Sequence, residues 1–231
     1  MPSLDVAVVI PWRGGDPDRE RHHEVVRARL RDVFPDAWHI DADSGHHPFN
    51  RAGSRNRGVR MAQDVGAGVV VVNDADTIPE PGPLRAAVQQ AAADGCLHTP
   101  YTRFVGLTEA GTRDYLAGLP LQRCGVDLEY GFSVGGVFVI RPDAWWRAGG
   151  MNKRFTAWGS EDMAFRRAAD TLLGPTVRHD GTIVHLWHPP ASRSGAAVNA
   201  GWDLAARYTA AAGDRVAMAA LVAEEVRCQS R

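Results

Sequence analysis

The sequence predicts an α/β fold in a single domain, with a mostly parallel central sheet flanked by helices and further helices near the C-terminus. Short runs rich in Val and Ile recur along the chain, and the clearest has four consecutive valines, Val69 to Val72. Segments with apolar residues at helical spacing separate these runs. A chain of 231 residues, 45% hydrophobic and 23% charged, is long enough to bury the core of one such domain.

The composition argues against several classes of protein. A net charge of −1 gives no strong field for nucleic acid or an anionic membrane surface. The three cysteines, Cys96, Cys124 and Cys228, are far apart and show no C-x-x-C spacing. We therefore expect no disulfide framework and a reducing, cytoplasmic location. No signal peptide precedes the first strand, and no apolar run approaches the ~20 residues of a membrane helix, so no membrane span is expected.

The first half of the chain alternates strands and helices. Asp16 is expected to cap the first helix, with Pro17 at its first position. Two glycines are costly inside the second helix, so Gly53 or Gly58 is expected to allow a close approach of the backbone. In chain order, the expected elements are a strand at 6–10, a helix from 17, a strand at 38–40, a helix at 50–63, a strand at 68–72, a helix at 83–93 and a strand at 96–101.

The second half is less regular. Residues 102–131 have weak periodicity and many glycines, so we expect a long loop region with one short helix at 112–116. Ser160 is expected to be an N-cap, which places Glu161 and Asp162 in the first turn of a helix. The other expected elements are a strand at 133–141, a helix from 142 to a Gly-Gly pair, the helix from 161 to about 173, a strand at 182–187 and a helical tail at 199–227 broken at Gly213.

Two carboxylates, Asp74 and Asp76, follow the valine strand directly. If the chain stays extended there, both side chains point to the same face, at the sheet edge where open α/β folds bind ligands. Paired hard oxygen ligands suit Mg²⁺ or Mn²⁺ with a phosphate. The alternative is that the two acids belong to an ordinary turn, where Asp is common.

Other charged residues also have two interpretations. Arg51, Arg55 and Arg57 form either a solvated helix face or a phosphate site near the helix N-terminus. In an extended strand, His185 and His188 point to opposite faces, so they are not expected to bind one metal.

Four motifs occur in one order: Phe-Asn-Arg-Ala at 49–52, Asp-Ala-Asp at 74–76, Gly-Gly at 135–136 and Trp-Gly-Ser-Glu-Asp at 158–162, followed by a strand with histidine. This order resembles the GT-A glycosyltransferases. It is most similar to those with the β-1,4-galactosyltransferase type of C-terminal half and to bacterial and phage family 2 enzymes. The resemblance covers about residues 5–190. It implies the GT-A fold and a nucleotide-sugar donor.

On the donor side, the resemblance implies contacts with the nucleotide base, the diphosphate and the sugar. The matching residues are Pro11, Trp12, Arg13 and Asp43 near the base, Phe49 and Arg51 at the nucleotide and diphosphate, and Asp74, Gly135 and Gly136 at the ribose or donor sugar. Arg13 and Arg51 are expected to add charge-assisted bonds to the diphosphate.

For the metal and the acceptor, the resemblance implies that Asp76 and His185 bind Mn²⁺ or Mg²⁺, with His188 as the alternative ligand. Trp158 would lie between donor and acceptor, and Glu161 would contact the acceptor. Asp162 would be the catalytic base, and at a helix N-terminus it is expected to stay ionised.

Two positions of the sequence can be compared with the pattern of the related families. The related galactosyltransferases have a Met metal ligand three residues before the His, and with His185 as the His that position is Thr182. Related retaining enzymes carry Asn where Asp162 stands, which favours an inverting reaction here.

The sequence therefore predicts a metal-dependent inverting glycosyltransferase that uses a nucleotide sugar, most readily a UDP-sugar. The acceptor would be a glycan or another hydroxyl-bearing molecule; nucleic acid is expected only as a modified base. Residues 1–100 would bind the nucleotide, 101–190 would hold the acceptor and catalytic residues, and 191–231 would form C-terminal helices. One alternative is a sugar-phosphate nucleotidyltransferase, for whose signature loop Gly14-Gly15 is a poor match. The other is a catalytically silent module that binds nucleotide sugars or glycans.

Overall fold

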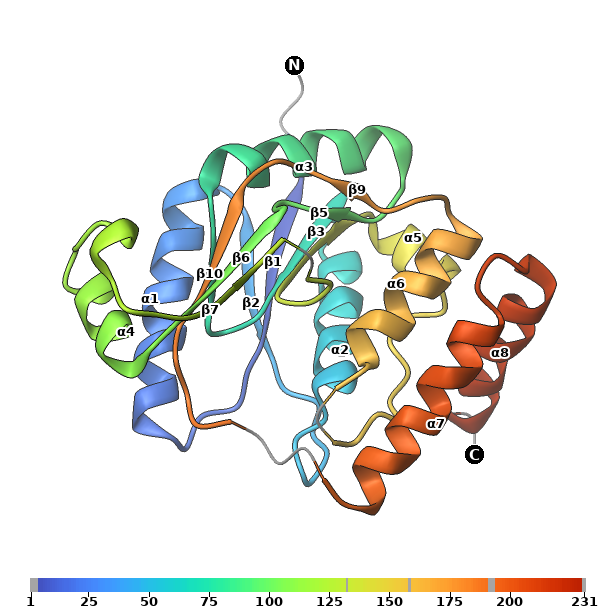
Figure 1. Ribbon diagram of the computed structural model, residues 1–231. Coiled ribbons are helices and arrows are strands. Elements are labelled where there is room, and N and C mark those ends of the chain that lie inside the picture. The colour runs from blue at the N-terminus through green and yellow to red at the C-terminus, as the bar shows by residue number, and fades with distance from the viewer. Residues whose placement is uncertain (1–3, 132, 158, 191–193, 230–231) are drawn as a thin grey trace.

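The valine-rich runs form the centre of a mixed sheet in the computed structural model, which describes residues 4–131, 133–157, 159–190 and 194–229 (Figure 1). Within these residues the main sheet has six strands in the order β2-β1-β3-β8-β5-β9. Only β8 runs antiparallel to its neighbours, so the sheet is mostly parallel. The strands are β1 (Val6–Pro11), β2 (Trp38–Ala42), β3 (Val69–Asn73), β5 (His98–Thr99), β8 (Val137–Ile140) and β9 (Val177–Arg178).

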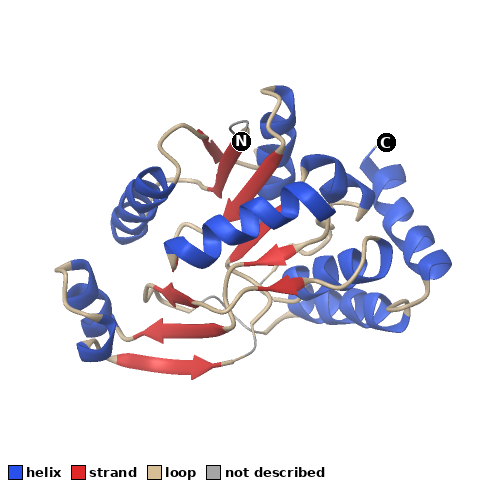
Figure 2. Ribbon diagram, turned by 90° about the horizontal axis from the view of Figure 1, so that it is seen from above, coloured by secondary structure: helices blue, strands red, loops and turns tan. Residues whose placement is uncertain are grey.

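Helices cover both faces of this sheet, because the strands are apolar on both sides (Figure 2). Along β1, Val8 and Ile10 face one core and Ala7 and Val9 face the other. The first core is closed by α1 (Pro17–Val33) and α3 (Pro81–Asp94). The second is closed by α2 (Arg51–Asp64), α5 (Pro142–Arg147) and α6 (Glu161–Leu172).

A second, smaller sheet in the described part of the chain takes two of its strands from residues 102–131, which the sequence predicted as a long loop. Its strands are β4 (Thr77–Pro79), β6 (Arg103–Leu107), β7 (Val126–Tyr130) and β10 (Thr182–His185), in the order β4-β10-β6-β7. The loop prediction for 102–131 is wrong because β7 is an exposed edge strand throughout, and so it lacks the buried alternation that marks a strand in sequence. The short helix predicted there exists as α4 (Glu109–Leu116), followed by a 3₁₀ turn, η1 (Leu121–Arg123).

The C-terminal residues form two helices, α7 (Ala196–Ala210) and α8 (Arg215–Gln229), with Gly213 between them as predicted. They pack against α6 on the side of the molecule away from α1 (Figure 1). None of the helices described is long and apolar enough to cross a membrane.

Helix α2 packs closely against the sheet at Gly58. A Cβ atom on Gly58 would stand 2.1 Å from Cγ1 of Val9 on β1 and 3.1 Å from Cβ of Ala42 on β2. Gly58 is therefore the position where the predicted close approach occurs. This contact fixes the height of α2 above the sheet, and so of the arginines that α2 carries.

Replacing Gly58 with Ala should destabilise the fold by about 1–3 kcal/mol, because the added methyl group overpacks the contact with Val9. Urea unfolding would measure the loss. Gly82→Ala is the matched control: nothing lies within 4 Å of the added Cβ in α3, so helix propensity should make it neutral or slightly stabilising. Equal stability of Gly58→Ala and the unmodified protein would contradict this account.

Candidate active site

The two acids after β3 lie in a tight turn rather than an extended strand. The backbone N–H of Thr77 donates to the carbonyl of Asp74 at 3.2 Å, and Asn73 Nδ2 donates to the carbonyls of Asp74 and Thr77. The alternation expected for an extended chain therefore does not apply. The turn sends the two carboxylates to different partners: Asp74 bonds to Arg55, and Asp76 faces two histidines.

Asp76, His185 and His188 form a group that could hold a metal ion. Nε2 of His185 lies 3.8 Å from Asp76 Oδ1, and Nε2 of His188 lies 3.3 Å from Oδ2. One ligand atom from each residue falls within 4.8 Å of the other two. The expectation that the histidines face opposite ways is wrong, because β10 ends at His185 and the chain leaves the extended conformation before His188.

The electrostatics of this group suit metal binding. Burial alone would raise the pKa of Asp76, but His185, His188 and Arg19 together hold that pKa below its ordinary value. Burial lowers the pKa of His185, which favours the neutral imidazole that binds metals. A carboxylate and two imidazoles suit Mn²⁺ better than Mg²⁺, which prefers an all-oxygen shell.

A cavity of about 290 Å³ opens beside the three ligand atoms. Arg19 and Arg51 line it, and Nη2 of Arg19 lies 3.5 Å from Asp76. Sequence reasoning missed Arg19, although Asp16 correctly predicted the first turn of α1 that carries it. The two arginines give this cavity the positive charge that a diphosphate would need.

Arg13, expected at the diphosphate, is instead paired with Asp43. Its Nε donates to Oδ2 at 2.8 Å and its Nη2 to Oδ1 at 2.5 Å, while Nη1 donates to the carbonyl of His46. The Arg13 guanidinium holds the pKa of Asp43 at about 2. It also stands over the ring of Phe49 at 5.3 Å. The structure thus brings together Arg13 and Asp43, expected near the nucleotide base, and Phe49, expected at the nucleotide and diphosphate.

Pro11 and Trp12, the other two residues expected near the nucleotide base, directly precede Arg13 in the chain. Pro11, at the end of β1, lines the same cavity as Asp76 and Phe49. Trp12 stacks flat on His23 of α1, with ring centroids 4.3 Å apart.

Two arginines of α2 bind the acids at the start of α6. Nη1 of Arg51 donates to Glu161 at 2.5 Å. Arg55 donates from Nη1 to Asp162 Oδ1 at 2.5 Å and from Nη2 to Asp74 Oδ1 at 2.6 Å. Arg55 is 0% exposed, so neither the solvated face nor the phosphate site predicted for it is correct. Its burial depends on acids far away in sequence, which a local pattern cannot reveal.

The glycine pair lies between the two carboxylates that Arg55 binds. The carbonyl of Gly136 accepts a hydrogen bond from the backbone N–H of Asp74 at 2.8 Å. A Cβ atom on Gly135 would stand only 2.2 Å from Oδ2 of Asp162. A side chain at position 135 would therefore displace Asp162, which explains why this position holds glycine.

Asp162 is a weaker acid than its place in a helix predicts. Burial raises its pKa to about 6, with the charges of Glu161 and Asp74 adding to the rise and Arg55 opposing it. Ser160 occupies the predicted N-cap position of α6, and Glu161 and Asp162 lie in the first turn as expected, but its backbone is left-handed with φ 73° and its side chain makes no cap bond. With a pKa of about 6, Asp162 is mostly ionised at neutral pH, as expected. Because burial raises its pKa, that pKa also lies in the range that suits a general base.

A second cavity, of about 330 Å³, joins Asp162 to the metal-ligand group. It shares Arg51, Asp74 and His185 with the first. Residues that sequence reasoning left without a role also line it: Phe104, Tyr130 and the half-exposed Trp202 of α7. Trp158 lies outside the described residues.

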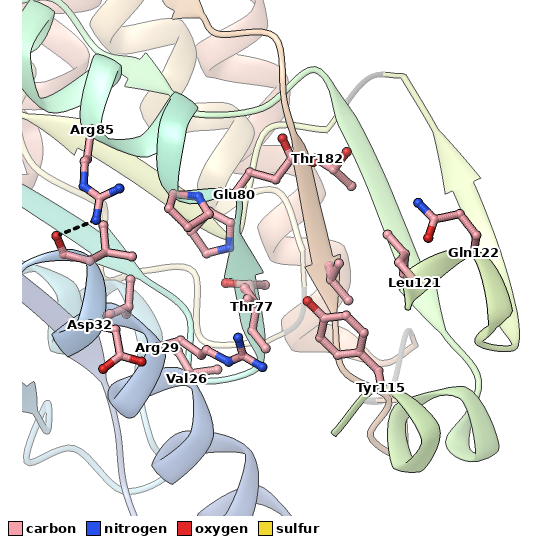
Figure 3. A pocket seen from close by; sticks show the side chains of 16 residues that line it. Val26, Arg29, Asp32, Thr77, Glu80, Arg85, Tyr115, Leu121, Gln122 and Thr182 are labelled. Atoms are coloured by element: carbon pink, nitrogen blue, oxygen red, sulfur yellow. Dashed lines mark hydrogen bonds between the residues drawn. The ribbon is translucent and has the colours of Figure 1, made fainter. Parts of the chain in front are cut away.

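A third cavity, of about 490 Å³ and so larger than these two, contains none of the predicted site residues. It lies between α1, β4 and the α4–η1 segment. Figure 3 shows Arg29 and Asp32 of α1 across from Tyr115 and Leu121. Arg85 there donates to the carbonyl of Val33 at 3.4 Å. Asp76, His185 and His188, the candidate metal ligands among the described residues, line the 290 Å³ cavity instead. We therefore place the candidate active site in the two smaller cavities.

Comparison with known proteins defines the class of this fold. Residues 118–177, which include Gly135, Gly136, Glu161 and Asp162, match the family described as the N-terminal domain of galactosyltransferase. Several solved structures have the same GT-A fold, so the predicted fold class is confirmed. The predicted enzyme class, a glycosyltransferase, is confirmed at the level of this fold and the matched segment.

Two of these structures illustrate the likeness. A mutant of Drosophila β-1,4-galactosyltransferase 7, solved with manganese, UDP-Gal and xylobiose, is 16% identical with a TM-score of 0.54, covering 80% of this chain and 72% of that one. GalNAc-T7, solved with UDP, GalNAc and Mn²⁺, is 9% identical with a TM-score of 0.53, covering 87% of this chain and 47% of that one. No curated protein matches the chain in sequence.

Removing ligands from the Asp76 group should weaken Mn²⁺ binding in the presence of UDP. We expect Asp76→Asn to abolish binding, and His185→Ala and His188→Ala each to weaken it by about tenfold or more, the scale seen when even a supporting residue of a metal site is lost. Mn²⁺ titration by calorimetry would measure this, with the exposed His46→Ala as control. Unchanged affinity in His188→Ala would remove His188 from the ligand set.

Proposed function

We propose that the chain is a metal-dependent, inverting glycosyltransferase that moves a sugar from a UDP-sugar to a hydroxyl group of a glycan or similar acceptor. One observation carries the proposal. The candidate metal ligands and the candidate base open onto two cavities that share Arg51, Asp74 and His185. A donor with its diphosphate at the metal would thus present its sugar beside Asp162. The manganese and UDP present in the two similar structures support the choice of metal and nucleotide.

Asp76, His185 and His188 would hold Mn²⁺, or Mg²⁺ less well. The metal would supply Lewis-acid stabilisation of the diphosphate leaving group. The spacing of the histidines supports this ligand set. The related galactosyltransferases have a ligand three residues before the His, and His185 takes that position if His188 is the His. This alignment replaces the earlier one, in which His185 was the His and Thr182 stood three residues before it.

The donor would be held by residues of the first 100 positions together with the glycine pair. Arg19 and Arg51 would neutralise the diphosphate, with Arg51 leaving Glu161 to do so. Asp74 would face the ribose or donor sugar. The remaining contacts would be Pro11, Trp12, Arg13, Asp43 and Phe49 at the nucleotide, and Gly135 and Gly136 along the sugar.

Asp162 would take the proton of the acceptor hydroxyl as it attacks the anomeric carbon. One displacement assisted by a base inverts that carbon, and no residue has to form a covalent intermediate. Glu161 would contact the acceptor, as would Trp158. A nucleotidyltransferase has no use for a base beside the sugar, so the position of Asp162 favours glycosyl transfer.

Replacing Asp162 with Asn should lower transfer by about 10²–10⁴-fold, because the general base is lost. The assay follows UDP release from a panel of UDP-sugars and GDP-sugars with Mn²⁺ and mixed glycan acceptors. NMR of the product should show an inverted anomeric configuration. Asp143→Asn, an exposed site on α5, is the matched control and should behave as the unmodified protein.

A binding measurement, taken together with turnover, distinguishes a glycosyltransferase from a catalytically silent binding module. UDP should raise the melting temperature only when Mn²⁺ is present, in both the unmodified protein and Asp162→Asn. Binding without turnover of any nucleotide sugar would support a silent module. The absence of a shift with every nucleotide would overturn the proposal.

The rate of transfer should depend on pH with an acid limb near the pKa of Asp162, about 6. A base acts only when ionised, so kcat should fall tenfold per unit as pH drops below that value and level off above it. Initial rates at saturating donor between pH 4.5 and 8 would test this. A profile that is flat down to pH 4.5 would rule out Asp162 as the base.

A further inference from the structure

Arg55 is a buried cation held by two acids of the candidate site. It comes from the middle of α2 and is 0% exposed. Its Nη1 reaches Asp162 and its Nη2 reaches Asp74, whereas no described residue accepts a hydrogen bond from its Nε. Phe138 lies under the guanidinium at 5.5 Å. An apolar side chain often gives an equally stable core, so fold stability alone does not account for this arginine.

The contacts distinguish the two oxygens of Asp162. Oδ1 accepts the hydrogen bond from Arg55. Oδ2 lies over Gly135, in the space that a side chain at position 135 would fill. Asp162 and Gly135 both line the 330 Å³ cavity. Oδ2 is therefore the oxygen left to meet an acceptor hydroxyl.

We propose that Arg55 is a positioning residue: it holds Asp162 by Oδ1, leaves Oδ2 to accept the acceptor's proton, and ties this base to Asp74 on the donor side. The inference rests on the proposed function, because it names the support of the proposed base. Arg55 itself is buried and lines neither of the two cavities.

The charges around Asp162 make the role measurable. Positive charge from Arg55 favours the ionised carboxylate, and negative charge from Glu161 and Asp74 disfavours it. Removal of Arg55 should therefore raise the pKa of Asp162, and Glu161→Gln should lower it. The titratable or charged groups that face Asp162 are Arg51 and Arg55 of α2, Asp74 after β3, Tyr101 after β5 and Glu161 of α6.

The test compares Arg55→Met with Arg60→Met, an exposed arginine of the same helix. With a UDP-sugar and Mn²⁺, Arg55→Met should lose about 100-fold in kcat at pH 7, the lower range for loss of general-base catalysis. Its acid limb should move to higher pH, while that of Glu161→Gln moves to lower pH. Arg60→Met should match the unmodified protein in both.

Three results would overturn the proposal. The first is a folded Arg55→Met with unchanged kcat and acid limb. The second is loss of kcat together with UDP–Mn²⁺ affinity while the acid limb stays in place, since this marks a purely structural residue. The third concerns Gly135→Ala, the variant used if Arg55→Met does not fold. Its added methyl should displace Oδ2 and lower kcat, and unchanged kcat would show that Oδ2 is not the proton acceptor.

A readout without substrate separates this proposal from the proposed function. Carbon-13 NMR titration of the Asp162 carboxyl, in the unmodified protein and Arg55→Met, measures the influence of Arg55 directly. If no nucleotide sugar is turned over, the proposed function fails, and an equal titration in both proteins overturns the role of Arg55 as well. If turnover is normal in Arg55→Met, only the role of Arg55 fails.

Discussion

The double ion pair of Arg55 is the interaction on which the geometry of the site depends. A guanidinium removed from water is costly unless it is paired, and here both terminal nitrogens bind carboxylates from two distant stretches of the chain. Asp74 comes from the turn after β3, and Asp162 from the first turn of α6. A single planar group thus sets the distance between Asp74 and Asp162.

Asp74 and Arg55 are in turn held in place by nearby contacts with the backbone. Asn73 pins the turn that carries Asp74, and the carbonyl of Gly136 accepts the N–H of that same aspartate. Gly58 lets α2 rest on β1 and β2, which brings Arg55 to the level of the strand ends. The site is therefore built on sheet and helix rather than on long loops, which suits chemistry that needs carboxylates held within a fraction of an ångström.

Much of this arrangement could be predicted from local pattern. The valine run predicted the central strand, and the order of the motifs, through the family resemblance, predicted that the Gly-Gly pair and Asp76 belong to one site. What could not be predicted depended on where elements end or what they pack against. His188 joins the metal-ligand group because β10 stops at His185, and a strand end is a property of pairing. Arg55 looks like any surface arginine in a helix until Asp162, 107 residues further on, is placed beside it.

Helix α6 contacts two different parts of the chain. Its first turn meets the arginines of α2, while its far flank closes a separate core with α7 and α8 through residues such as Ala168, Tyr208 and Met218. The carboxylates of that first turn are therefore supported from two directions, by α2 on one side and by α7 and α8 on the other. Because close-packed interiors transmit strain, repacking around Tyr208 or Met218 would shift α6 and with it Asp162. Residues that line neither cavity can in this way alter the geometry of the candidate site.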